Sequence, residues 1–278
     1  MGVVGMLAFL HRRPSFALAD EIFSGSFRGN APENWKRLCR WGMRRAEFNI
    51  VNDPSRIELQ REYAAISDDG RIIVYPGAFR ETPAPGVRAS LRQKWGIPGE
   101  ALVIAVSGNF DQTMGAEWLL KALQDRAGLH CVIQPVALNA MSRILLGYIR
   151  GRERVYVEDR KLGWQEAWAS AVGVDIGLAI YLNQGPQFQR MGTSSNRLCM
   201  FLSMGVPVIA SRQPSFEFLE QYECGVLVDS YEEFLSAIER IRQNMDRMKV
   251  NARACARNYI DSQGHYADLA KEVRWVLE

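Results

Sequence analysis

The chain has 278 residues, 47% apolar and 23% charged, with a formal net charge of +3. This length and apolar content suffice for one large or two modest hydrophobic cores, and the nearly balanced charge excludes a strongly basic nucleic-acid-binding protein. No apolar run reaches the roughly 20 residues of a membrane-spanning helix. The five cysteines form no CxxC pair and the three histidines lie far apart, so we expect buried thiols, no metal site and a cytoplasmic protein.

Short strands and helices alternate in the first 85 residues. The predicted elements, in chain order, are a strand at 3–10, a helix at 33–46, a strand at 48–53, a helix at 55–66 and a strand at 71–77. This stretch is too short for a sheet of average strand number with its crossovers, so it predicts only part of an α/β domain. The Pro- and Gly-rich residues 80–86 predict an interdomain linker.

From about residue 100 the same alternation is more complete. The predicted strands are 101–108, 129–135, 154–159, 174–182, 206–211 and 224–229. The predicted helices are 115–125, 140–150, 164–171, one that starts at Ser195, and three closing helices at 231–246, 248–260 and 265–277. Short β-branched strands that alternate with helices predict an α/β fold with a Rossmann-type, doubly wound parallel sheet. Ligands of such a sheet bind beyond the carboxyl ends of its strands.

A polar helix start precedes the strand at 206–211. Ser194, Ser195 and Asn196 stand before an apolar helix, whose free N–H groups and partial positive charge favour an anion such as phosphate. Arg197 can add a charge-assisted hydrogen bond, and Gly108 lets the backbone approach a ligand closely. Ser and Asn before a helix are also ordinary N-caps, so both interpretations stay open.

Three stretches, taken together, resemble a known family. They are AEFNIVNDPSRIELQREY with RIIVYPGAF (46–79), LRQKWGIPGEALVIAVSGN (91–109) and GVPVIASRQPSFEFLEQYECGVLVD (205–229). The first is similar to the end of the N-terminal acceptor domain of GT-B-type retaining glycosyltransferases (group 1, family-four-like). The other two resemble the C-terminal donor domain of that family. The resemblance covers most of the chain after about residue 33.

The resemblance implies a domain organisation and an activity. It places a partial, truncated N-terminal acceptor-type α/β domain at 1–85, a nucleotide-sugar donor-binding α/β domain at 86–262, and a C-terminal helix at 263–278 that crosses back to the N-terminal part. The implied activity is transfer of a sugar from a nucleotide-sugar donor to an unidentified acceptor, which is a glycan, a lipid-linked molecule or a small molecule. The implied transfer proceeds with retention and needs neither a cofactor nor a metal.

The resemblance also implies a donor site. Residues at the matching positions are expected to bind the donor diphosphate, namely Gly108, Asn109, Ser194, Ser195, Asn196 and Arg197. Residues near the nucleotide base and ribose are expected to be Val157, Asp159, Leu162 and Met200. The sequence does not identify the catalytic residues.

Four charged residues of the family pattern are absent from this chain. The family's two glutamates, separated by seven residues, correspond to Gly192 and Met200, and its two donor-site cations correspond to Asn109 and Met114. One missing charged group at a developing anion raises a reaction barrier by ~3 kcal/mol. A catalytically degenerate nucleotide-sugar-binding or scaffolding protein, or a fragment of a longer enzyme, is therefore the alternative to an active transferase. An epimerase of the same architecture is a third possibility.

The helix at 33–46 combines two tryptophans with five basic residues. Basic amphipathic helices bind anionic membranes, so a weak membrane-surface contact and a peripheral location are one interpretation. A solvated basic face with tryptophans in the core is the other, and it is the commoner use of such a helix.

Overall fold

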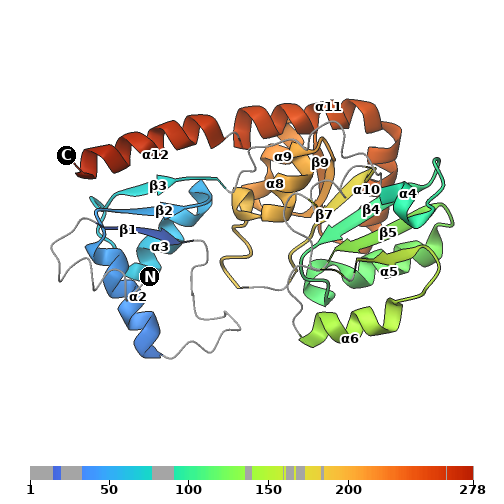
Figure 1. The fold of residues 1–278 in the computed structure, drawn as a ribbon, viewed down its shortest axis with the longest axis horizontal. Coiled ribbons are helices and arrows are strands. Elements are labelled where there is room, and N and C mark those ends of the chain that lie inside the picture. Colours follow the sequence, from blue (N-terminus) through green and yellow to red (C-terminus); the bar gives the residue numbers. More distant parts are fainter. Residues whose placement is uncertain are drawn as a thin grey trace. The chain divides into compact units, whose positions relative to one another are not determined.

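The computed structural model describes residues 15–19, 33–76, 91–134, 140–158, 160, 166, 173–182, 185–260 and 262–277. The chain forms two compact units, shown in Figure 1. Unit 1 comprises residues 1–80, 184–194 and 260–278, and unit 2 comprises residues 81–183 and 195–259. The expected donor domain, 86–262, was continuous, whereas in the structure the short segment 184–194 belongs to unit 1.

Unit 2 contains a six-stranded sheet in which all paired strands are parallel. Its strands are β4 (Leu102–Ser107), β5 (Leu129–Gln134), β6 (Val155–Val157), β7 (Ile176–Ala179), β8 (Val208–Ser211) and β9 (Gly225–Val228). Their order in the sheet is β6-β5-β4-β7-β8-β9, so the direction of winding reverses between β4 and β7. The predicted α/β fold with a doubly wound parallel sheet is therefore confirmed.

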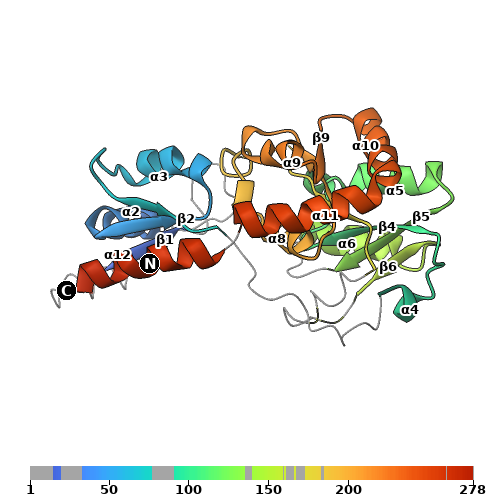
Figure 2. The same cartoon turned by 90° about the horizontal axis from the view of Figure 1, so that it is seen from above.

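Helices of unit 2 pack against this sheet and against one another, and their course is clearest in Figure 2. They are α4 (Leu91–Trp95), α5 (Ala116–Asp125), α6 (Ala140–Ile149), α8 (Asn196–Ser203), α9 (Phe218–Gln221), α10 (Tyr231–Gln243) and α11 (Met245–Cys255). Completely buried side chains from strands and helices, such as Ile104, Leu119 and Phe234, form the core. The predicted helix at 164–171, apart from Glu166, lies outside the described residues, as do the linker at 80–86 and the strand at 3–10.

Unit 1 contains three parallel strands in the order β1-β2-β3. They are β1 (Phe16–Ala19), β2 (Phe48–Val51) and β3 (Ile72–Val74), accompanied by the helices α2 (Glu33–Arg45), α3 (Ile57–Ala64) and α12 (Ser262–Leu277). A small core of Ala17, Met43, Val51, Leu59 and Ala64 joins β1 and β2 to α2 and α3. The sequence analysis did not predict β1, which is short and exposes about half of both Phe16 and Leu18. In the part of the chain that the structure describes, no helix is long and apolar enough to cross a membrane.

Close packing of α8 on the sheet depends on a glycine in β7. Gly177 lies beneath the fully buried ring of Phe201, and a Cβ atom at this glycine would lie only 2.3 Å from the ring atom Cδ2. Real Cβ atoms do not approach a ring so closely. The absence of a side chain at Gly177 therefore sets the distance between α8 and the sheet.

Gly177→Ala is expected to lower the free energy of unfolding by about 2 kcal/mol, because the added methyl group forces Phe201 out of its buried position. Urea unfolding followed by circular dichroism measures this change. Gly147→Ala is the matched control, since a Cβ at that helical glycine meets nothing within 4 Å. The control is expected to stabilise the chain by roughly 0.5–1 kcal/mol. Equal stability of the two variants would contradict the packing account.

Candidate functional site

The reversal of strand order between β4 and β7 marks the place where a ligand can enter unit 2. In doubly wound sheets, neighbouring strands lead their connections to opposite faces at this point, and ligands bind in the crevice beyond the carboxyl ends of these strands. Gly108 follows β4 directly, and Tyr181 lies two residues beyond β7. Helix α8, which begins at Asn196, is the next described α-helix after β7 in the sequence. The residues around this crevice are therefore the first candidates for a binding site.

Ser195 caps the start of α8. Its backbone is extended, and its hydroxyl oxygen accepts a hydrogen bond from the backbone N–H of Leu198 at 3.3 Å. The same hydroxyl lies 2.6 Å from the hydroxyl of Tyr181, so Ser195 is fully engaged within the protein. The ordinary capping role is thus present. The N–H groups of Asn196 and Arg197 still have no carbonyl partner within the helix, because the first turn of a helix supplies none.

Arg197 extends from this helix start to the turn after β4. The backbone of Gly108 has φ +96°, and a Cβ atom there would lie 3.0 Å from the guanidinium nitrogen Nη2 of Arg197. The guanidinium carbon also lies 5.5 Å from the centre of the Tyr181 ring, which is a cation–π distance. The glycine and the aromatic ring together hold the guanidinium beside the crevice.

One nitrogen of this guanidinium has no partner. The atom Nη1 of Arg197 is buried and makes no hydrogen bond to any residue that the structure describes. A buried donor left without an acceptor destabilises a protein by about 1–3 kcal/mol, and more when it is charged. An anion that accepts a hydrogen bond from Nη1 would satisfy this donor, and the free N–H groups of the first turn of α8 also favour an anion. A phosphate group has the charge and the acceptor oxygens that this arrangement requires.

The structure says less about the other residues that are predicted to bind the diphosphate. Asn109 continues the turn after Gly108 and is partly exposed, while Asn196 is exposed on the first turn of α8. The hydroxyl oxygen of Ser194 is buried without a hydrogen-bond partner among the described residues, but this residue belongs to unit 1. The structure therefore brings Gly108, Ser195 and Arg197 together.

The residues predicted near the nucleotide base are only partly described. Val157 ends β6 with 7% of its surface exposed, whereas Asp159 and Leu162 lie outside the described residues. Met200 is 7% exposed and lies among the buried side chains of α8. Its role beside a ribose stays a prediction.

Two of the four positions that lack the family's charged residue hold buried methionines. Met114 is 6% exposed and Met200 is 7% exposed, so both side chains belong to the interior of unit 2. Arg212 follows β8 but does not replace a missing cation, because its guanidinium donates to the carboxylate of Asp229 at 2.8 Å and to the carbonyl of Leu227 at 2.9 Å. Among the residues predicted to bind the diphosphate, Arg197 is therefore the cation.

Sequence reasoning missed Tyr181. Its ring and its hydroxyl position two of the predicted residues, since the ring contacts Arg197 and the hydroxyl contacts Ser195. In a sequence, an aromatic residue at the end of an apolar strand is usually interpreted as a core residue. The signal that could have identified it is its place after β7, at the edge where ligands bind.

Gly192, where the resemblance implies a glutamate, lies in unit 1 against a buried carboxylate. Asp53 follows β2, and its atom Oδ2 accepts a hydrogen bond from the backbone N–H of Thr193 at 2.7 Å. Gly192 has φ +42°, and a Cβ atom there would lie 1.8 Å from this oxygen. A glutamate at position 192 therefore does not fit this structure. The carboxylate of Asp53 occupies the space that its side chain would need.

Arg56 also forms hydrogen bonds to the segment that contains Gly192. Its atom Nε donates to the carbonyl of Arg190 at 3.0 Å, and its Nη2 donates to the carbonyl of Gln187 at 3.2 Å. Arg56 is only 3% exposed, so these charge-assisted bonds are protected from water. Together with Asp53 they explain why residues 184–194 belong to unit 1.

Gly192→Ala is expected to lower the free energy of unfolding by about 3 kcal/mol, because the methyl group displaces Asp53 and the residue must keep a positive φ. Urea unfolding measures the loss. Gly264→Ala in α12 is the control within unit 1, since nothing lies within 4 Å of its added Cβ. If both variants unfold at the wild-type urea concentration, Asp53 does not hold this segment.

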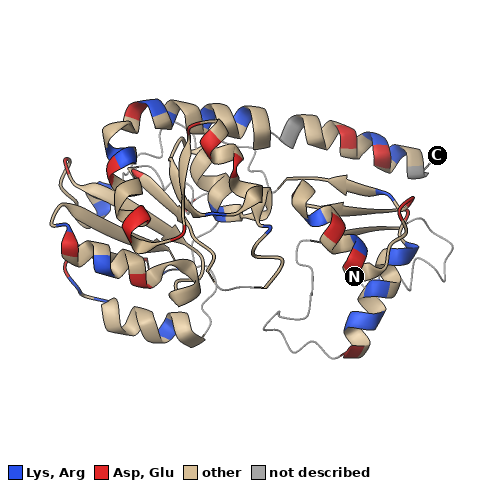
Figure 3. Cartoon of the chain, turned by 180° about the vertical axis from the view of Figure 1, so that it is seen from behind, with Lys and Arg blue, Asp and Glu red and all other residues tan. Residues whose placement is uncertain are grey.

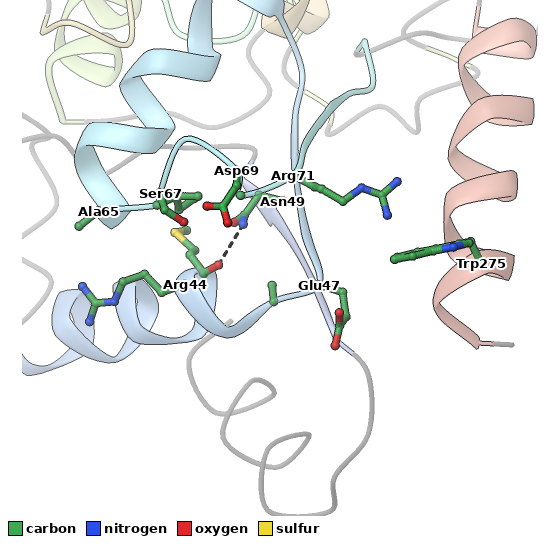
Figure 4. A pocket seen from close by; sticks show the side chains of 12 residues that line it. Arg44, Glu47, Asn49, Ala65, Ser67, Asp69, Arg71 and Trp275 are labelled. Carbon is green, nitrogen blue, oxygen red and sulfur yellow. Dashed lines mark hydrogen bonds between the residues drawn. The ribbon is translucent and has the colours of Figure 1, made fainter.

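A pocket of about 360 Å³ lies at the opposite, amino edge of the unit 1 sheet, beside Glu47 and Arg71 (Figure 4). Arg71 forms an ion pair with Glu272, and its guanidinium lies 4.5 Å from the centre of the Trp275 ring. Its charge is thus already matched within the protein. The crevice at the unit 2 switch point, with its orphan guanidinium nitrogen, remains the better candidate site.

Comparison with known proteins identifies the fold. No protein-family model and no curated protein matches the chain. Sucrose-phosphate synthase from Thermosynechococcus elongatus matches with a TM-score of 0.73 and 16% identity, over 99% of this chain and 72% of that chain. HepE from Anabaena, solved in complex with UDP and glucose, matches with a TM-score of 0.69 and 16% identity, over 98% and 74%.

A glycosyltransferase from Rickettsia africae matches with a TM-score of 0.65 and 12% identity, over 99% of this chain and 80% of that chain. At these identities the similarity establishes the fold and leaves activity open. The chain has the GT-B fold of glycosyltransferases, as the sequence resemblance implied.

Proposed function

We propose that the chain is a glycosyltransferase that binds a nucleotide-sugar donor at the switch point of unit 2. The observation that supports this most is the nitrogen Nη1 of Arg197, on the first turn of α8, which is buried and has no hydrogen-bond partner among the described residues. The fold shared with HepE, which was solved with UDP and glucose, makes UDP the first nucleotide to test. The acceptor, and transfer with retention, are part of the proposal that the resemblance alone supports.

The chemistry follows from charge. When the bond between the sugar and the diphosphate breaks, negative charge grows on the departing diphosphate oxygen. Arg197 and the N–H groups at the start of α8 would interact more strongly with this oxygen in the transition state than in the intact donor. This difference would lower the barrier to transfer. Gly108 would let the diphosphate approach the backbone, and Tyr181 would keep the guanidinium in position. None of these steps calls on a metal ion or a cofactor.

Arg197→Met is expected to weaken UDP binding by roughly tenfold or more, because a charge-assisted hydrogen bond contributes about 1.5–3 kcal/mol. Isothermal titration calorimetry measures the dissociation constant. Arg240→Met on α10 removes an exposed guanidinium of the same unit and should leave UDP binding unchanged. The unliganded Arg197→Met protein should be no less stable than wild type, since the substitution also removes an unsatisfied buried donor.

The proposal fails if the wild-type chain binds neither UDP nor another nucleoside diphosphate. It also fails if both arginine variants weaken binding equally, because the effect would then reflect net charge.

A catalytically degenerate binding protein is the second candidate, and the burial of Met114 and Met200 favours it. Both candidates bind the nucleotide, so release of the sugar separates them. An active transferase slowly hydrolyses or transfers the sugar of a bound donor, whereas a degenerate protein holds the donor intact. An epimerase would return a nucleotide-sugar with altered sugar stereochemistry, which nuclear magnetic resonance detects.

Met200→Glu tests for a latent ribose site. If the position still faces a ribose, the new carboxylate accepts hydrogen bonds from its hydroxyls and should tighten UDP binding by about tenfold. Met200→Gln has a similar volume without the charge and is the control. Unchanged affinity in Met200→Glu would show that this position no longer faces the nucleotide.

Contact of the helix at 33–46 with a membrane stays a prediction. In the structure this segment is α2, along which basic positions, coloured blue, recur in Figure 3. Arg40 is paired with Glu33 at 2.7 Å, whereas Arg37 and Arg44 are exposed, and Trp35 is 50% exposed. These features suit either a solvated face or a weak contact with anionic lipid.

A further inference from the structure

Helix α6 of unit 2 exposes an apolar stripe to solvent. Met141 is 49% exposed, Ile144 is 56% exposed and Tyr148 is 73% exposed. Their spacing of three and four residues places them along one face of the helix. The opposite face, which includes Leu146 and Ile149, is buried in the core. Both sides of α6 are therefore apolar, although only one side packs against the protein.

This stripe is unusual for unit 2. Among its described residues, four large apolar side chains are exposed, and three of them are the α6 residues. The fourth, Val250, lies on α11. Single exposed apolar side chains are normal, but several that adjoin on one helix mark a surface that contacts another apolar phase.

The charges around the stripe are mostly positive. Between residues 140 and 154 the chain carries four arginines and a single acidic residue, Glu153. Three of the arginines, Arg143, Arg150 and Arg152, are exposed. The helix itself contains no carboxylate, and most of its length is uncharged in Figure 3. An apolar stripe beside exposed arginines would fit a surface with an apolar interior and negatively charged groups at its edge.

We propose that the α6 stripe docks unit 2 on an anionic lipid surface. Anionic headgroups attract the exposed arginines, the tyrosine suits the boundary between water and hydrocarbon, and shallow insertion needs only one helix face. A second copy of the chain is the less favoured occupant. A stable protein interface buries about 800 Å² on each partner, which three half-exposed side chains do not supply.

A hydrogen bond joins helix α6 to the turn after β4, which belongs to the candidate donor site. The hydroxyl oxygen of Ser142, which is fully buried on α6, accepts a hydrogen bond from the backbone N–H of Phe110 at 3.2 Å. Phe110 belongs to the turn that begins at Gly108. Docking through α6 would thus hold the turn of the donor site close to the lipid surface, although the docking itself does not depend on the proposed activity.

Co-sedimentation with vesicles tests the proposal. The wild-type chain should sediment with vesicles of phosphatidylglycerol and phosphatidylcholine, and not with vesicles of phosphatidylcholine alone. Replacing the stripe by Met141→Gln, Ile144→Gln and Tyr148→Gln together should weaken binding at least tenfold. Val250→Gln is the matched control, because it removes an apolar side chain that is 62% exposed elsewhere in unit 2 and should leave binding unchanged.

Circular dichroism verifies that the triple variant folds, and Tyr148→Gln alone, at the most exposed position, replaces it if it does not. Absence of binding by the wild-type chain overturns the proposal. So does binding that survives the α6 substitutions but disappears with Arg37→Gln and Arg44→Gln, which would assign the lipid contact to α2. A dimer in light scattering that the α6 substitutions abolish, without vesicle binding, would assign the stripe to a second copy.

Discussion

The guanidinium of Arg197 occupies a place that the sheet topology creates. Strand order reverses between β4 and β7, so the connections after these strands part and leave a crevice at their carboxyl ends. Gly108 turns there with a positive φ that a side chain would not tolerate, and its missing Cβ leaves room for the guanidinium. The ring of Tyr181 also contacts the guanidinium. The positive charge is thereby fixed before any ligand arrives, which is the condition for effective electrostatic stabilisation.

Three of the residues that depart from the family pattern, from both units, lie where the family's charged side chain would be unfavourable. Met114 and Met200 are interior side chains, where a charged group would have to leave water. Gly192 rests on the carboxylate of Asp53, whose hydrogen bonds hold its segment in unit 1. Among the residues predicted to bind the diphosphate, Arg197 carries the one positive charge, and the start of α8 adds free N–H groups. Release of the sugar from a bound donor would therefore separate an active transferase from a protein that only binds the donor.

The local sequence pattern predicted the fold of unit 2 well, because its strands are buried on both faces and read as continuous apolar runs. It missed β1, a short strand in which Phe16 and Leu18 are exposed. It assigned residues 184–194 to the donor domain because the bonds from Asp53 and Arg56 join residues more than 130 positions apart. Tyr181 was also missed, since its importance lies in what its ring touches. Long-range contacts of this kind leave no local periodicity to read.

A crystal structure of the chain with UDP would test the central claim most directly. The account predicts diphosphate oxygens within hydrogen-bond distance of Arg197 Nη1 and of the first N–H groups of α8, with the guanidinium still beside Gly108 and the ring of Tyr181. UDP bound elsewhere, or Arg197 turned away to a protein carboxylate with the crevice empty, would contradict it.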